Sequence, residues 1–212
     1  MTADALREGP VAAAVRRHRL IVVLRRVEPQ AHLLEIVEQL ADSGARAFEI
    51  TWDSPSAAGD LSAVREHLAG RSDGPHLVGA GTVLRIDQLA AARSAGADFA
   101  VAPVLDPELL RAAVGAGLPF IPGALTPTEI AAAWAAGATF VKLFPASAVG
   151  PSFVRELRGP LPDVPLIATG GVDASNAAAF LAAGAVAVGI GSALTRAGAD
   201  ERRAIVAGVA AP

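Results

Sequence analysis

The sequence contains no cysteine and no tyrosine, and only one methionine and two tryptophans among its 212 residues. Without cysteine, the chain has no disulfide bond, no thiolate metal ligand and no cysteine nucleophile. Few aromatic residues are available for stacking on nucleic-acid bases. A formal net charge of −3 gives no general attraction to nucleic acid. The expected partner is therefore a small molecule.

Long hydrophobic runs are absent as well, although 52% of the residues are hydrophobic. A membrane-spanning helix requires about 18 consecutive apolar residues. The early apolar run from Leu20 to Leu24 is much shorter and is flanked by Arg19 and Arg25. This run also lacks the context of a signal-peptide cleavage site. We expect a cytoplasmic protein that does not enter a membrane.

Lysine is nearly absent: Lys142 stands alone against seventeen arginines. An arginine cannot attack a carbonyl group, because its guanidinium stays charged at ordinary pH. A buried lysine can, since burial lowers the pKa of the amine and frees its nucleophilic form. Lys142 lies in the apolar, strand-like run Phe140 to Leu143. Two interpretations follow, a nucleophilic lysine or a structural lysine held by an ion pair.

Glycine, in contrast, recurs at intervals of 20 to 26 residues. Several of these glycines follow an alanine-rich helical stretch and precede a short apolar run, which is typical of helix C-caps. The recurring positions are Gly44, Gly70, Gly96, Gly117, Gly137, Gly159, Gly184 and Gly208.

The apolar runs predict eight strands, alternating with helical stretches such as Ala31 to Ala41 and Thr128 to Ala136. Alternation at this spacing is typical of parallel βα units, and eight units favour a closed single-domain (β/α)8 TIM barrel over residues 1–212. A doubly wound open sheet is the alternative. An extra N-terminal helix over residues 2–18 is expected to plug the base of the barrel. The predicted strands are Leu20–Leu24, Ala47–Ile50, Leu77–Val78, Phe99–Val101, Phe120–Ile121, Phe140–Leu143, Leu166–Ala168 and Ala185–Val188.

Chemistry in such barrels takes place at the carboxyl ends of the strands, where Arg25, Glu49 and Lys142 all fall. A carboxylate at the end of an apolar strand is costly unless it is paired or used. Glu49 is therefore either an ion-pair partner of Arg25 or Lys142, or a general acid/base that moves protons for an imine-forming lysine.

The last two strands end in glycine-rich segments, Thr169-Gly-Gly171 and Gly189-Ile-Gly-Ser192, each before a predicted helix. Glycine allows backbone N–H groups to approach a phosphate closely, and helix N-termini favour anions. Phosphate sites after the seventh and eighth strands recur in this fold. We predict a phosphate site here, with tight turns as the alternative. The four histidines have no metal-ligand spacing and are expected at the surface.

Six motifs, taken in order along nearly the whole chain, resemble the 2-keto-3-deoxy-6-phosphogluconate (KDPG) aldolase family. They are Phe48-Glu-Ile-Thr51, Gly79-Ala-Gly-Thr-Val83, Ala102-Pro103, Phe120-Ile-Pro-Gly123, Val141-Lys-Leu-Phe-Pro145 and Ala168-Thr-Gly-Gly-Val172. The resemblance implies a class I aldolase that needs no metal and no cofactor and forms a homotrimer. Its implied reaction cleaves KDPG to pyruvate and glyceraldehyde 3-phosphate.

The resemblance also implies roles for individual residues. Lys142 would form the Schiff base and Glu49 would shuttle protons. The implied substrate-binding residues are Arg25, Thr82, Pro103, Phe144 and Thr169, and the implied phosphate-binding residues are Gly170, Gly171, Gly191 and Ser192.

One departure concerns Asp53, which stands where gluconate-type members usually carry an arginine for the substrate carboxylate. Arg25 is expected to supply that charge instead, and in this respect the chain resembles the 6-phosphogalactonate branch of the family. Thr51 and Thr169, in contrast, resemble the gluconate branch. The gluconate substrate is preferred, with 2-keto-3-deoxy-6-phosphogalactonate or 4-hydroxy-2-oxoglutarate as alternatives. Two rival functions use the same barrel: a phosphosugar isomerase or epimerase, and a non-catalytic barrel that binds a sugar phosphate.

Overall fold

The structure is a computed structural model that describes residues 2–210. In this part of the chain nine parallel strands form one sheet in the order β5-β4-β3-β2-β1-β9-β8-β7-β6. The strands are β1 (Leu20–Leu24), β2 (Ala47–Thr51), β3 (Leu77–Gly81), β4 (Ala100–Val101), β5 (Phe120–Ile121), β6 (Gly123–Ala124), β7 (Val141–Leu143), β8 (Leu166–Thr169) and β9 (Ala187–Ile190).

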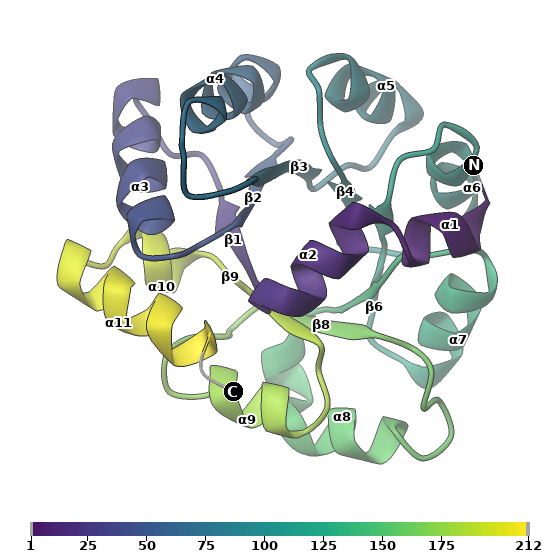
Figure 1. Cartoon of the computed structure of the whole chain (residues 1–212). Helices are drawn as coiled ribbons and strands as arrows, with labels where there is room; N and C mark the ends of the chain where they lie inside the picture. Colours follow the sequence, from purple (N-terminus) through teal and green to yellow (C-terminus); the bar gives the residue numbers. More distant parts are fainter. Residues whose placement is uncertain (1, 211–212) are drawn as a thin grey trace.

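The sheet closes on itself through Pro122, which separates β5 from β6 at the two ends of the strand order. Because proline has no N–H to donate, it interrupts a strand. β5 therefore pairs with β4 on one side, and β6 pairs with β7 on the other. The predicted barrel of eight βα units is confirmed (Figure 1). Its fifth strand is divided into β5 and β6.

Helices surround the barrel, as Figure 1 shows in a view along its axis. They are α1 (Ala3–Arg7), α2 (Pro10–His18), α3 (Gln30–Asp42), α4 (Ala57–Ala69), α5 (Ile86–Ser94), α6 (Pro107–Gly115), α7 (Pro127–Ala135), α8 (Gly150–Leu157), α9 (Ala177–Ala182), α10 (Ser192–Thr195) and α11 (Ala199–Ala210), with the short 3-10 helix η1 (Ala146–Ala148).

The N-terminal segment forms two helices rather than the single expected one. The helical conformation is interrupted before Gly9, which is the N-cap of α2. Pro10 then occupies the first turn of α2, a position that tolerates the missing N–H of proline. Ala12 and Val15 of α2 are fully buried against the side chains inside the barrel. The helix crosses the middle of the barrel mouth at the amino ends of the strands (Figure 1), so it does plug the base.

The inside of the barrel is filled by inward-facing side chains from alternate strand positions. The lower layer is apolar and contains Ala47, Phe140 and Ile167. Since side chains two residues apart on a strand point to the same face, Glu49, Lys142 and Thr169 form the next inward layer toward the carboxyl ends. The register that buries the apolar layer thus also places these three polar side chains together inside the barrel, in the layer above it.

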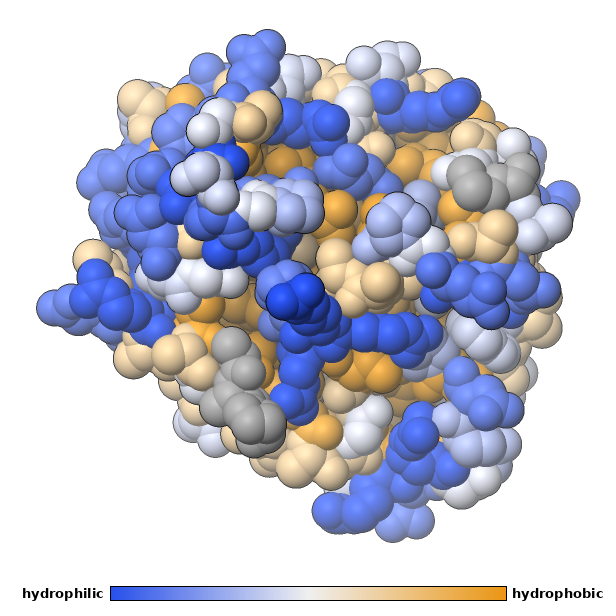
Figure 2. All heavy atoms as spheres, in the orientation of Figure 1, coloured by the Kyte–Doolittle hydropathy of each residue, from blue (hydrophilic) through white to orange (hydrophobic). Residues whose placement is uncertain are grey.

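The opposite mouth, at the amino ends, has a polar covering. In Figure 2 hydrophilic atoms gather across the centre of this face, over α2, with hydrophobic atoms showing between them. No helix within residues 2–210 is long and apolar enough to cross a membrane.

Candidate active site

A cavity of about 780 Å³ opens at the carboxyl ends of the strands. It brings together ten of the eleven residues predicted from the sequence to form the site. These are Arg25, Thr82, Pro103, Lys142, Phe144, Thr169, Gly170, Gly171, Gly191 and Ser192. The eleventh, Glu49, lies behind Lys142 within the barrel.

Lys142 and Glu49 form a buried pair at the floor of this cavity. The Nζ atom of Lys142 lies 3.8 Å from Oε1 of Glu49, and their side chains are only 5% and 3% exposed. Within the described residues, Oε1 accepts no hydrogen bond. A buried carboxylate oxygen without a donor is unusual, and here it is placed to accept or return a proton beside the amine.

The wall beside the amine is apolar and aromatic. Nζ of Lys142 lies 5.0 Å from the centre of the Phe144 ring, and Pro103 lines the same cavity. Such a wall limits access of water to a carbonyl group held at Lys142, and the ring face favours a positively charged nitrogen.

Arg25, directly after β1, reaches across the rim to two neighbours. Its Nη1 donates to Oδ2 of Asp53 at 2.6 Å, and its Nη2 donates to Oγ1 of Thr82 at 3.0 Å. Arg26 also pairs with Asp53, with 3.4 Å between Nε and Oδ2. Arg25 thus lines the cavity and is held at two points. Its predicted contact with the substrate carboxylate stays a prediction.

The pKa of Asp53 lies below its usual value. Burial acts to raise this pKa, but a hydrogen bond from Thr51 and the charge of Arg25 outweigh burial. Asp53 is therefore an anion at neutral pH. It neutralises one of the two neighbouring arginines, Arg25 and Arg26, which leaves a single net positive charge for an anionic ligand.

The side of the cavity formed by β8 and β9 has an exposed backbone. Gly170 and Gly171 have φ angles of 88° and 73°, a left-handed conformation that glycine adopts without steric cost. A Cβ atom at Gly171 would lie 2.4 Å from Cβ of Ser147. Position 171 therefore excludes any residue with a side chain, and both glycines line the cavity with backbone that can offer N–H groups to an anion.

Sequence reasoning missed several lining residues, notably Arg196 and Asp173. Asp173 directs its carboxylate to its own loop, where Oδ1 accepts from the backbone N and the hydroxyl of Ser175. Arg196 follows Ser192 by one helical turn, and that spacing could have indicated it. The sequence alone does not tell whether the first turn of α10 points toward the cavity.

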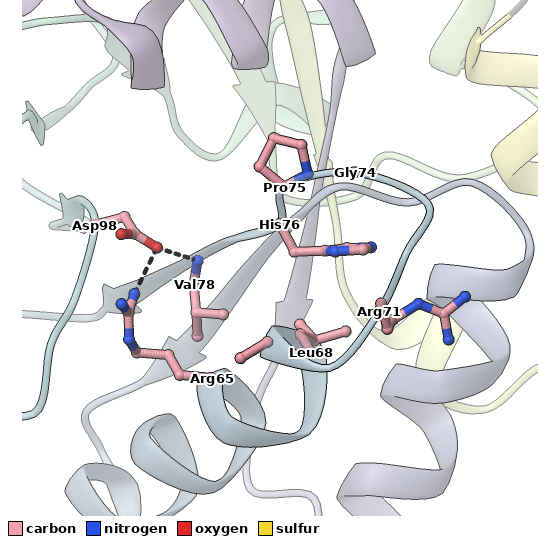
Figure 3. Close-up of a pocket in the computed structure, with 9 residues that line it drawn as sticks. Arg65, Leu68, Arg71, Gly74, Pro75, His76, Val78 and Asp98 are labelled. Atoms are coloured by element: carbon pink, nitrogen blue, oxygen red, sulfur yellow. Dashed lines mark hydrogen bonds and ion pairs between the residues drawn. The ribbon is translucent and has the colours of Figure 1, made fainter.

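A second cavity, of about 310 Å³, lies at the other end of the barrel, beside the amino end of β3. Figure 3 shows Asp98 between Arg65 and the backbone of Val78, each at 2.8 Å. His76 lines this cavity with a side chain only 2% exposed. The expectation that all four histidines lie at the surface is therefore wrong for His76, which lines this cavity together with Leu68 (Figure 3). None of the predicted site residues lines this cavity.

The described part of the chain contains no candidate metal centre. Among residues 2–210, no three side chains of the ligating types His, Asp and Glu gather closely enough to hold a metal ion.

The fold and the site define a (β/α)8 barrel whose single lysine lies beside a buried carboxylate, under a cavity lined on one side by glycines. The sequence pattern of the family described as "KDPG and KHG aldolase" matches residues 11–207. The chain belongs to this family, and it is accordingly an enzyme of the lyase class.

Three known proteins illustrate the similarity. The 2-dehydro-3-deoxy-6-phosphogalactonate aldolase of Escherichia coli is 37% identical over 185 residues, which cover 87% of this chain and 88% of the relative. The 2-dehydro-3-deoxy-phosphogluconate aldolase of Pseudomonas aeruginosa is 39% identical over 169 residues, which cover 79% and 74%. The crystal structure of KDPG aldolase from Legionella pneumophila, with pyruvate captured as a covalent carbinolamine intermediate, has a TM-score of 0.80 at 26% identity and covers 96% of this chain and 98% of that one.

Proposed function

We propose that this protein is a class I aldolase that cleaves KDPG to pyruvate and glyceraldehyde 3-phosphate through a Schiff base on Lys142. The observation that carries the proposal is the buried pair at the cavity floor, with Nζ of Lys142 3.8 Å from Oε1 of Glu49. A nucleophilic amine and a group that moves protons are the two parts that this reaction requires.

The first half of the reaction forms the imine. The neutral amine of Lys142 attacks the C2 ketone of the substrate, and the carbinolamine then loses water to give an iminium. Glu49 accepts and returns the protons of these steps, because its Oε1 lies 3.8 Å from Nζ and has no hydrogen-bond partner within the described residues. Arg25 and Thr82 hold the C1 carboxylate at the rim.

The second half breaks the carbon skeleton. A base removes the proton of the C4 hydroxyl, the C3–C4 bond breaks, and its electrons pass into the iminium to give an enamine. Glyceraldehyde 3-phosphate leaves with the new aldehyde at the former C4. The enamine is then protonated at C3, and water hydrolyses the iminium to release pyruvate and the free amine. The phosphate lies against Gly170, Gly171, Gly191 and Ser192, which line one side of the cavity.

The configuration at C4 distinguishes two candidate substrates. Thr169, whose side chain lies in the inward layer with Lys142, supports the gluconate epimer, because its hydroxyl offers a polar partner near the reacting carbons. The guanidinium of Arg25, bound to Thr82 and Asp53, supports the galactonate epimer as second candidate. The E. coli galactonate enzyme, which resembles a larger share of this chain than the P. aeruginosa relative does, supports it as well.

Measurement of kcat/KM with both epimers decides between them. Thr169→Val lowers kcat/KM for the gluconate epimer and leaves the galactonate epimer unaffected if the hydroxyl selects at C4. An equal effect on both epimers would assign Thr169 a packing role.

We also propose a homotrimer. Three exposed apolar side chains, Leu84, Ile86 and Val104, are 47%, 49% and 52% exposed and follow the neighbouring strands β3 and β4. Apolar side chains gathered at one part of a surface are typical of contacts between subunits. Light scattering coupled to size exclusion measures the mass directly, with Ile86→Glu expected to shift it toward the monomer.

Borohydride trapping with pyruvate tests the central proposal. The reaction fixes an iminium as a stable amine, and mass spectrometry of the digested protein locates the adduct. The sequence makes this assignment unambiguous, since Lys142 is the only lysine. An adduct on the Lys142 peptide, absent in Lys142→Arg, supports the aldolase. Folded protein without an adduct excludes it and favours the isomerase or the non-catalytic sugar-phosphate-binding barrel.

A further inference from the structure

The rim between β1 and β9 carries a cation to which the sequence analysis assigned no role. Arg196 lines the active-site cavity together with Gly191 and Ser192. It also lines an adjoining cavity of about 530 Å³, whose wall includes Arg25 and Ser192 as well. Arg196 therefore lies where the two cavities meet, on the side of the glycine-rich backbone.

The positive charge of Arg196 is available to a ligand. Each of the other two cations of the active-site cavity has a carboxylate partner: Lys142 pairs with Glu49, and Arg25 pairs with Asp53. The Arg196 side chain has neither an ion pair nor a hydrogen bond within residues 2–210. Asp173, a carboxylate that lines the same cavity, accepts from Ser175 in its own loop.

The local geometry places Arg196 and Ser192 on the same side of one helical turn. α10 begins at Ser192 directly after Gly191, and the backbone N–H of Arg196 donates to the carbonyl of Ser192 at 3.2 Å. Side chains four residues apart on a helix are neighbours on its surface. A group bound by the hydroxyl of Ser192 is thus within reach of the guanidinium of Arg196.

A second arginine fixes this turn from behind. Arg202 of α11 is 6% exposed, and it donates through Nε to the carbonyl of Leu194 at 2.9 Å and through Nη2 to that of Thr195 at 3.1 Å. These carbonyls are the groups that a short helix leaves unpaired at its end, and a cation there is favourable. Arg202 is a positioning residue that acts through α10 and does not reach the cavity.

We propose that Arg196 binds the phosphate group of the substrate and sets the preference of the enzyme for phosphorylated over unphosphorylated substrates. This inference rests on the proposed function. Backbone N–H groups and a hydroxyl supply hydrogen bonds, whereas a phosphate carrying nearly two negative charges also calls for a cation. A guanidinium meets that need with paired donors in the geometry of a phosphate.

The condensation reaction tests the inference, because either aldehyde can be supplied as the partner of pyruvate. The expected result for Arg196→Met is a rise of roughly tenfold or more in KM for D-glyceraldehyde 3-phosphate, the effect of losing a hydrogen bond to a charged group. KM for unphosphorylated D-glyceraldehyde should not change. Arg196→Lys restores part of the difference, since it keeps the charge and loses the paired donors.

Inorganic phosphate gives a second readout on the same variants. It should inhibit the condensation of unphosphorylated glyceraldehyde by the wild-type enzyme and lose that effect in Arg196→Met. The matched control is Arg155→Met, on the exposed face of α8. It should leave KM for both aldehydes and the inhibition by phosphate unchanged.

The inference and the proposed function fail in different ways. Borohydride trapping of pyruvate on Lys142 involves no phosphate, so it should proceed equally in the wild type and in Arg196→Met. An intact adduct with unchanged discrimination between the aldehydes overturns the role of Arg196 and leaves the aldolase standing. An equal rise in KM for both aldehydes also overturns the role of Arg196 in phosphate binding, because a purely structural role would affect both aldehydes alike. If the wild-type protein forms no adduct, the proposed aldolase function itself is overturned.

Discussion

Gly81, the last residue of β3, lies against the carboxylate of Glu49 with no room for a side chain between them. A Cβ atom at position 81 would stand 2.0 Å from Oε1 of Glu49 and 2.5 Å from its Cγ and Cδ atoms. The absence of a side chain at position 81 therefore leaves the space that the carboxylate of Glu49 occupies. Gly81 is part of the motif Gly79-Ala-Gly-Thr82, whose other end contacts Arg25 through Thr82.

Gly81→Ala should inactivate the enzyme while the barrel still folds. The new methyl group displaces the Glu49 carboxylate from its position beside Lys142, so we expect kcat to fall by roughly a hundredfold or more, the contribution of a general acid/base. The measurement is steady-state kinetics together with circular dichroism. Gly59→Ala is the control, because a Cβ atom there meets nothing within 4 Å. Full activity in Gly81→Ala would contradict the importance of that placement.

Glu49→Gln removes the proton-transfer group and keeps its shape. Because the amide neither accepts nor releases a proton in the imine steps, kcat should fall by about 10² to 10⁴. Lys142 should still be trapped with pyruvate and borohydride, but more slowly than in the wild type. A stopped-flow time course of trapping checks this. An unchanged rate would show that water, and not Glu49, carries the protons.

Asp53→Asn separates the charge of Asp53 from its function as an acceptor. The amide oxygen can still accept from Nη1 of Arg25, so the guanidinium stays in place, while the repulsion between Asp53 and the substrate carboxylate is lost. Two charges about 4 Å apart in water interact by roughly 1 kcal/mol, so KM for pyruvate should fall by up to about fivefold.

Asp53→Ala is the companion variant, and it removes the acceptor as well. Arg25, whose side chain is half exposed, then loses its anchor, and KM for pyruvate should rise. Kinetics of condensation with saturating aldehyde measures both variants. A rise in KM for both would mean that the negative charge of Asp53 itself is needed for binding.

The sequence predicted the barrel and most of the site, because both depend on short-range patterns. Glycines after helices and apolar runs give the order of the units, and in parallel units that order places Lys142 and Glu49 on one rim. The distance between these two residues could not be predicted, since β7 and β2 are far apart in the strand order. The division of the fifth strand at Pro122 follows from the missing N–H of proline and could have been expected.

Residues that depend on several elements at once were beyond sequence reasoning. Arg196 lines the cavity from the end of α10, and Arg202 on the following helix donates to the carbonyls of that end. The pairing of Asp53 with Arg25 joins the loops after β2 and β1, and its geometry is set by the curvature of the barrel. In both cases the residues are ordinary charged side chains, and only their surroundings distinguish them.

Asp73, at the base of the barrel, should make stability depend on pH in the acid range. Hydrogen bonds from Arg71 lower the pKa of Asp73 from 3.8 to about 2. A carboxyl group whose pKa is lower in the folded than in the unfolded protein stabilises the fold above the unfolded pKa. This stabilisation is present above about pH 4 and is lost as the pH falls through about 2.

Asp73→Asn should therefore lower the melting temperature slightly at pH 7 and by progressively less as the pH falls below 4. The effect is small because the group is solvent-exposed and screened, and Arg71 keeps its contacts with Glu38 and Asp42. Thermal unfolding of both proteins between pH 7 and pH 2.5 measures it. Asp200→Asn is the control, since Asp200 has a 99% exposed side chain and pairs only with Arg203 among the described residues. A constant difference between Asp73→Asn and the wild type at every pH would show that Asp73 contributes packing and not charge.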